Sequence, residues 1–93
     1  MATGRGRTSP IKRQDLVRLL KALGVEEHAG SGKGSHRMLA RPIPGEPHRW
    51  LKTTLPYHSD TEDIQPSVVK SIRRKLHLAP EHGVSDARFF QEG

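Results

Sequence analysis

Two stretches with helical periodicity lie near the ends of this sequence, and the segment between them has the period of strands. A helix is predicted over residues 11–23, because four leucines recur at i, i+3, i+4 and i+7 and would form one apolar side. They are Leu16, Leu19, Leu20 and Leu23. Gly24 is the expected left-handed residue after this helix. A second helix is predicted over residues 66–78, where Pro66 suits the first turn. Its predicted apolar stripe is Val68, Val69, Ile72 and Leu76.

Three strands are predicted between these helices, over residues 25–29, 35–41 and 48–55. Side chains alternate along the third strand, so its two sides are predicted to carry Leu51, Thr53 and Leu55 on one and Trp50, Lys52 and Thr54 on the other. Residues 42–47, PIPGEP, contain three prolines and a glycine, which predicts an irregular loop. The second and third strands then form an antiparallel hairpin across that loop.

This order of elements predicts an α+β fold, in which two helices cover one face of a three-stranded antiparallel sheet and leave the other face open. Residues 1–10 hold glycines and arginines and are predicted to be a flexible basic arm. The domain itself is expected over residues 11–80. Residues 81–93 form a tail with a possible short helix that Ser85 caps, and Phe89 and Phe90 are expected to dock on the core or on a partner.

Composition limits the classes of function. The 93 residues include 16 Lys and Arg against 10 Asp and Glu, a net charge of +6. Such a balance favours a polyanion such as nucleic acid as partner, although an acidic protein is attracted by the same field. There is no cysteine, and the six histidines lack metal-ligand spacing, so we expect no metal or other cofactor. No apolar run is long enough to cross a bilayer, and a cytoplasmic location is expected.

The glycine-rich stretch GSGKGSHRM, residues 30–38, has two interpretations. It can be a hairpin turn that needs positive φ angles, followed by an ordinary surface histidine. Alternatively, glycine lets a phosphate backbone approach closely, Lys33 and Arg37 attract it, and His36 exchanges a proton near neutral pH. If Leu39 faces the helices, alternation predicts that His36 points away from them.

Three motifs in this order resemble the HicA family of toxins, the YcfA-like mRNA interferases. They are KGSHR (33–37) after a basic helix and a short strand, LPYHS (55–59) at the end of the third strand, and PSVVKSIRRKL (66–76) in the last helix. The resemblance covers about residues 11–78. It implies an α-β-β-β-α fold like that of a double-stranded-RNA-binding domain, and metal-independent endoribonuclease activity on mRNA. It also implies a HicB-like antitoxin as partner, with oligomers formed through the antitoxin complex.

The resemblance also assigns residues. The family's catalytic histidine, which follows Gly and Ser, corresponds to His36 after Gly34 and Ser35. Its P-x-H histidine corresponds to His58 after Pro56 and is a second catalytic group or an RNA contact. Unlike many family members, this chain carries acids in the 56–65 loop, and these are expected to weaken RNA binding nearby: Asp60, Glu62 and Asp63.

The implied mechanism uses His36 as general base on a ribose 2′-OH, which attacks the adjacent phosphorus and leaves a 2′,3′-cyclic phosphate and a 5′-OH. Lys33 and Arg37 would stabilise the developing charge. Basic side chains of the helices are either solvated or contact phosphate or an acidic antitoxin: Arg18, Lys21, Lys70, Arg73, Arg74 and His77. Trp50 and Tyr57 either stack on bases or pack internally, and packing is favoured for Trp50. A non-catalytic RNA-binding module and an antitoxin-binding domain remain the alternatives.

Overall fold

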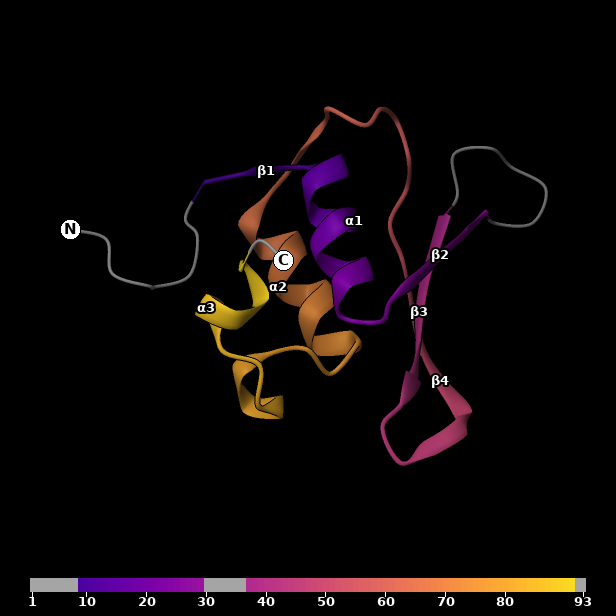
Figure 1. Ribbon diagram of the computed structural model, residues 1–93. Coiled ribbons are helices and arrows are strands. Elements are labelled where there is room, and N and C mark those ends of the chain that lie inside the picture. The colour runs from indigo at the N-terminus through magenta and orange to yellow at the C-terminus, as the bar shows by residue number, and fades with distance from the viewer. Residues whose placement is uncertain (1–8, 30–36, 92–93) are drawn as a thin grey trace.

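The computed structural model describes residues 9–29 and 37–91 (Figure 1). Its elements in chain order are β1 (Ile11–Lys12), α1 (Arg13–Ala22), β2 (Glu26–Ala29), β3 (Arg37–Ile43), β4 (Glu46–Thr54), β5 (Asp63–Ile64), α2 (Pro66–Lys75), a 3₁₀ turn (Pro80–His82) and α3 (Asp86–Phe89). β2, β3 and β4 form an antiparallel sheet in that order. α1 and α2 lie side by side on one face of it. The α+β fold is confirmed and is compatible with a double-stranded-RNA-binding-domain-like arrangement.

The core lies between the helices and the sheet. It is centred on leucines that are fully buried, Leu16 and Leu20 of α1, Leu39 of β3, and Leu76 just after α2. The leucine period of the first helix therefore identified its buried side. Gly24 has φ +91°, and it ends α1 in the left-handed conformation that was expected.

The first helix begins later than the sequence predicted. Ile11 and Lys12 are strand residues that pair with Ile64 and Asp63 in a second, two-stranded sheet, so α1 starts at Arg13. This pairing also gives the 56–65 segment a short strand where only a loop was expected. The pairing ties the start of α1 to the residues just before α2.

The prediction that PIPGEP is irregular was wrong. β3 continues through Pro42 and Ile43, β4 starts at Glu46, and only Pro44 and Gly45 form the turn, with Gly45 at φ +84°. A register shift between Pro42 and Ile43 absorbs the irregularity, and β4 is an edge strand, where a proline is tolerated. The hairpin is consequently longer than expected.

The second helix ends at Lys75, and its two sides differ from the prediction. Val68 is 41% exposed, whereas Arg73 is only 6% exposed. Arg73 is buried because the C-terminal segment packs against α2. Arg73 donates hydrogen bonds to the carbonyl oxygens of Leu78 (3.0 Å) and Val84 (2.9 Å), and its guanidinium lies 4.3 Å from the Phe89 ring centroid.

The C-terminal tail docks on the protein's own core. Phe89 is 1% exposed and belongs to the hydrophobic core, and the Phe90 ring meets it edge-on with centroids 4.9 Å apart. The Ser85 hydroxyl accepts a hydrogen bond from the Arg88 backbone N–H (3.1 Å), which confirms the expected cap of the short helix α3.

Candidate nucleic-acid interface and catalytic end of the sheet

Four of the predicted site residues, Lys33, Gly34, Ser35 and His36, lie outside the described residues. Arg37 is the next residue, and it opens β3. Of the KGSHR motif, the structure therefore describes Arg37 and the residues that contact Arg37.

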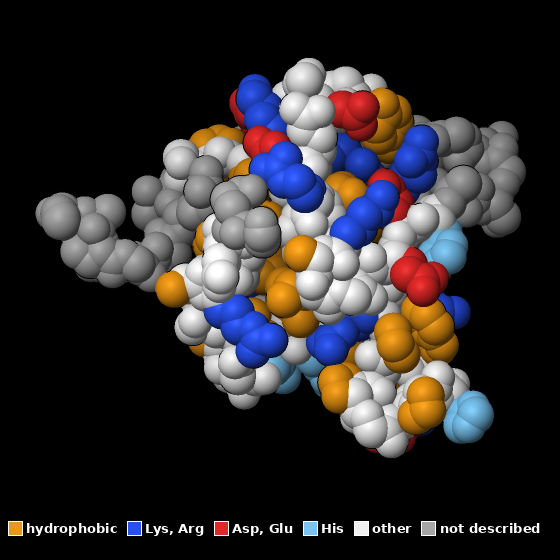
Figure 2. All heavy atoms as spheres, viewed as in Figure 1, with side chains coloured by type: hydrophobic (Ala, Val, Ile, Leu, Met, Phe, Trp, Pro, Cys, Tyr) orange, Lys and Arg blue, Asp and Glu red, His pale blue; other side chains and the backbone are white. Residues whose placement is uncertain are grey.

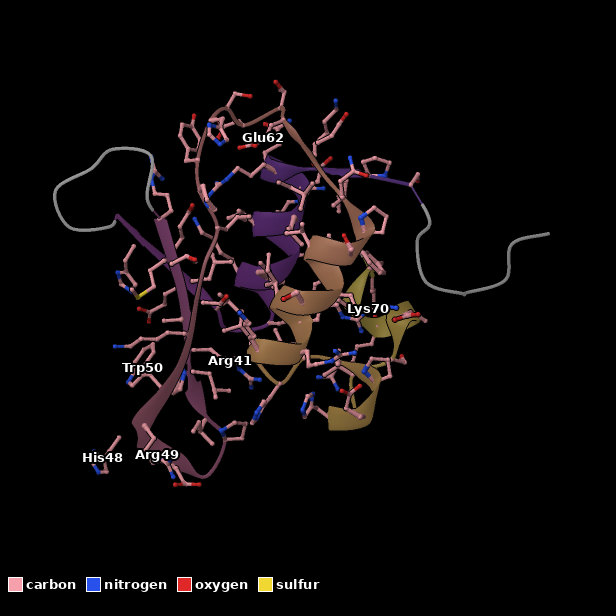
Figure 3. The ribbon with its side chains drawn as sticks, turned by 180° about the vertical axis from the view of Figure 1, so that it is seen from behind. Arg41, His48, Arg49, Trp50, Glu62 and Lys70 are labelled. Atoms are coloured by element: carbon pink, nitrogen blue, oxygen red, sulfur yellow. The ribbon has the colours of Figure 1, made fainter. Side chains whose placement is uncertain are left out.

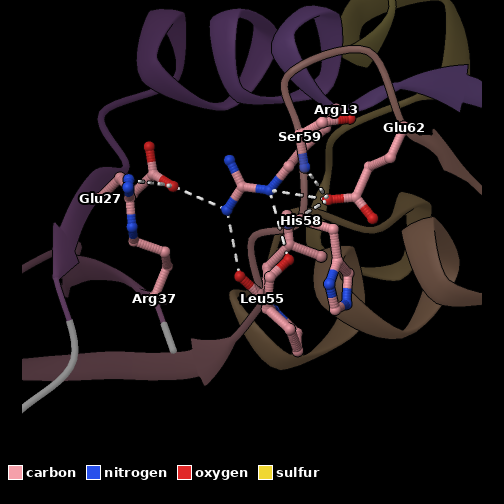
Figure 4. A network of polar contacts seen from close by, with 8 residues as sticks. Arg13, Glu27, Arg37, Leu55, His58, Ser59 and Glu62 are labelled. Atoms are coloured by element: carbon pink, nitrogen blue, oxygen red, sulfur yellow. Dashed lines mark hydrogen bonds and ion pairs between the residues drawn. The ribbon is translucent and has the colours of Figure 1, made fainter. Parts of the chain in front are cut away.

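The structure brings the histidine of the second motif to the same end of the sheet. The Leu55 backbone N–H donates to the Arg37 carbonyl oxygen at 3.0 Å, so the chain that leaves β4 starts beside the first residue of β3. His58 follows three positions later and is exposed. Arg37, which follows His36 in the sequence, and the LPYHS motif thus lie at one end of the three-stranded sheet (Figure 4).

Arg37 is a partly exposed cation held in place by its neighbours. Its guanidinium carbon lies 4.5 Å from the Tyr57 ring centroid, and its Nη1 lies 3.6 Å from Glu27 Oε2. The side chain is 32% exposed. The Tyr57 ring therefore supports a cation, and the guanidinium keeps donors available for an anion.

Arg13 is the buried centre of this end of the molecule, and the sequence analysis did not identify it. Its side chain is 2% exposed, and its Nη2 donates to Glu27 Oε2 at 2.7 Å and to the Leu55 carbonyl at 3.1 Å (Figure 4). Its Nε donates to the Pro56 carbonyl at 3.4 Å and lies 3.8 Å from Glu62 Oε2. Arg13 thereby joins α1, β2 and the chain after β4. A signal existed, because Arg13 stands three residues before Leu16 on the apolar stripe.

Glu62 fixes the loop that carries His58. Its Oε2 accepts hydrogen bonds from the backbone N–H groups of His58 (2.9 Å) and Ser59 (3.4 Å). The His58 N–H, more than any other contact, lowers the pKa of the Glu62 carboxyl below its ordinary value. Asp63 pairs with Lys12 at 2.9 Å. Two of the loop's three acids are thus engaged within the protein, which reduces the repulsion of RNA that the sequence suggested.

The cations predicted on the helices do not form one surface with Arg37. Arg18 and Lys21 are exposed on α1, and Arg18 pairs with Asp15 at 3.1 Å. Lys70 and Arg74 line a groove of about 630 Å³ between α2 and the C-terminal segment, and Arg74 Nε lies 3.6 Å from Glu81 Oε2. Figure 3 shows Lys70 on the side of α2 away from the sheet.

Several cations serve the fold itself. Arg41 of β3 donates through Nη1 to the carbonyl oxygens of Leu76 (2.9 Å) and His77 (3.3 Å). A side chain of the sheet thereby caps the C-terminus of α2. Arg13 and Arg73 are buried with their donors used inside the protein. On the face in Figure 2, Lys and Arg side chains stand apart, several with an acid beside them. The net charge therefore overstates the cations available to a ligand.

The prediction that Trp50 packs internally was wrong. Its side chain is 40% exposed, and in Figure 3 it points away from the helices, whereas Arg41 points toward them. The strand alternation itself was correctly predicted, since Leu51 and Leu55 pack on the core side. Trp50 is exposed because both long helices of the described residues, α1 and α2, lie on the other face of the sheet.

These features define a small basic α+β protein in which Arg37 and the LPYHS motif lie at one end of the sheet. A family model described as HicA toxin of bacterial toxin-antitoxin matches residues 13–78, which is most of the chain. The protein belongs to this family of toxins. A search of curated proteins and a search of solved structures each found no match. Within residues 9–29 and 37–91, no helix is long and apolar enough to cross a membrane.

Proposed function

We propose that this protein is an endoribonuclease that cleaves mRNA without a metal, and that His36 is its general base. His36 would take the proton of a ribose 2′-OH, and the oxygen would attack the adjacent phosphorus. The P–O5′ bond then breaks, which leaves a 2′,3′-cyclic phosphate on one fragment and a 5′-OH on the other. Lys33 and Arg37 would stabilise the charge on the phosphoryl oxygens, and Gly34 and Ser35 would let the backbone approach.

The observation that supports this proposal is the position of Arg37 and His58. Arg37 follows His36 directly in the chain, and the Arg37–Leu55 hydrogen bond holds the start of the LPYHS motif beside it. A cation and a second imidazole at one end of the sheet suit an RNA phosphodiester. His58, which the anchored 58–62 loop carries, would protonate the departing 5′ oxygen or contact a phosphate.

The proposed partner is a HicB-like antitoxin that covers this end of the sheet. Toxin–antitoxin membership implies a neutralising partner, and an acidic surface would complement Arg37, whose side chain is 32% exposed at this end of the sheet. Oligomers would then form through the complex.

Inducible expression of the wild-type protein and of His36→Ala tests the proposal. The wild type should arrest growth and produce cellular mRNA fragments with 2′,3′-cyclic phosphate ends, and the variant should do neither. Matched protein levels and thermal unfolding midpoints exclude a folding defect. A His36→Ala protein that still cleaves mRNA refutes the assignment. A variant that keeps RNA affinity, beside a wild type that makes no new ends, indicates a non-catalytic binding module.

A further inference from the structure

We infer that the helix-free face of the sheet, centred on Trp50, is a stacking platform for an unpaired base of single-stranded RNA. This inference rests on the proposed function, because it names a contact of the same substrate outside the cleavage motif. The family match and the two histidine motifs say nothing about this face.

The register of the sheet defines the platform. In β4, His48, Trp50, Lys52 and Thr54 alternate to the side away from the helices, and all are exposed. Across the β3–β4 pair, Trp50 stands beside Pro42, Lys52 beside Ala40, and Thr54 beside Met38. Figure 3 shows Trp50 and His48 on the outer side of the hairpin. No helix of the described residues therefore covers Trp50, and it lies next to the ring of Pro42 rather than a bulky side chain.

An exposed tryptophan on an open sheet is typical of a ligand-binding surface. Trp50 and Val68 are the exposed large hydrophobic side chains of the described part of the chain, and Val68 lies on α2. A tryptophan face stacks on nucleobases, and open sheets that carry aromatic side chains bind single strands in this way.

The charges beside Trp50 favour RNA over a protein partner. Lys52 is exposed and has no ion pair within residues 9–29 and 37–91, so its ammonium group is available to a phosphate two positions from the stacked base. His48, which is also exposed, lies on the other side of Trp50 along β4. Arg49, by contrast, pairs with Glu46 at 3.2 Å.

The platform also leads toward the cleavage end of the sheet. Thr54 lies four positions after Trp50, about 13 Å along β4 at the usual strand rise. Thr54 pairs with Met38, which follows Arg37. RNA whose base stacks on Trp50 can therefore run along one face toward the start of β3. Trp50 would set where the substrate lies, as a positioning residue that takes no part in the proton transfers.

The chain has one tryptophan, so its fluorescence reports this face alone. The probe is a short single-stranded 2′-O-methyl oligoribonucleotide at low salt, which lacks the attacking hydroxyl and cannot be cleaved. Binding should quench Trp50 emission, and the same sequence as a duplex should quench it much less because its bases are already stacked. With a labelled oligonucleotide, Trp50→Ala should bind about 5-fold more weakly or worse, and Trp50→Phe should retain most of the affinity. Val68→Ala is the matched control and should bind like the wild type.

The outcomes separate the two proposals. Quenching together with the loss in Trp50→Ala supports the platform even if the wild type cleaves no RNA, a result that would end only the nuclease proposal. Binding without quenching, or with equal affinity in Trp50→Ala, overturns the platform and leaves cleavage untouched. A shift of Trp50 emission with protein concentration alone, and none with RNA, overturns it in favour of contact between two copies of the chain.

Discussion

Arg13→Met is the sharpest test of how this end of the molecule is held together. Arg13 is 2% exposed, and its partner Glu27 is 12% exposed. Methionine keeps much of the apolar stem but removes the charge and the donors. Among residues 9–29 and 37–91, Glu27 then keeps only Arg37 as an ion-pair partner, at 3.6 Å, and the carbonyl oxygens of Leu55 and Pro56 lose the Arg13 donors.

The size of the effect follows from these contacts. Removing one partner of a buried ion pair typically costs about 3–5 kcal/mol, because the remaining charge is left without compensation. A domain of this size has a total stability of about 5–15 kcal/mol, so the loss is a large share of it. If the uncompensated Glu27 charge causes the loss, adding Glu27→Gln to Arg13→Met should restore at least about 1 kcal/mol. Arg13→Lys keeps a charge but has fewer donors, and should lose about 1–3 kcal/mol.

Urea unfolding at low temperature, followed by circular dichroism, measures these differences. The matched control is Arg18→Met on the same helix. Arg18 is 59% exposed and pairs with Asp15, so its loss should cost less than about 1 kcal/mol. If Arg13→Met and Arg18→Met have equal stabilities, the network in Figure 4 does not hold the site together.

Two further predictions concern the loop at the site and the C-terminal segment. Because folding lowers the pKa of Glu62 from 4.5, the ionised carboxylate stabilises the folded loop above that pH, and the contribution disappears as the pH falls through the lowered pKa. The unfolding midpoint of Glu62→Gln should therefore fall less steeply with acidification than that of the wild type, and parallel pH profiles would contradict this. Arg73→Met should cost about 2–3 kcal/mol, because the carbonyl oxygens of Leu78 and Val84 and the partly exposed Asp86 lose their donors, and hydrogen exchange at residues 84–90 should accelerate. Unchanged exchange there would show that Arg73 does not hold the segment.

The sequence predicted the parts of the fold in which period reports burial. Leucines at helical spacing identified the buried side of α1, and alternation identified the two sides of β4. The prediction of an irregular loop at residues 42–47 was wrong because the pairing of the two hairpin strands outweighs the local propensity of proline. In that pairing, Pro42 stands opposite Trp50.

The predictions for Arg73 and Trp50 were wrong for one physical reason. Hydropathy is a property of the isolated side chain and does not include its tertiary contacts. Arg73 was placed on an exposed side of its helix, either solvated or in contact with phosphate or an antitoxin, because it is charged, yet the folded C-terminal segment supplies its acceptors. Packing was favoured for Trp50 because it is large and apolar, yet its side chain lies on the face of the sheet opposite to α1 and α2. The site had the same difficulty, since the motifs named His58 but gave no sign of the Arg13 contacts that position its loop.

The most direct measurement uses purified protein and a synthetic single-stranded RNA in the presence of EDTA, with the 3′ ends of the products identified by mass. We predict 2′,3′-cyclic phosphate ends with the wild type and none with His36→Ala of equal thermal stability. Cleavage that requires a metal, or that proceeds equally in the His36→Ala protein, would contradict the account.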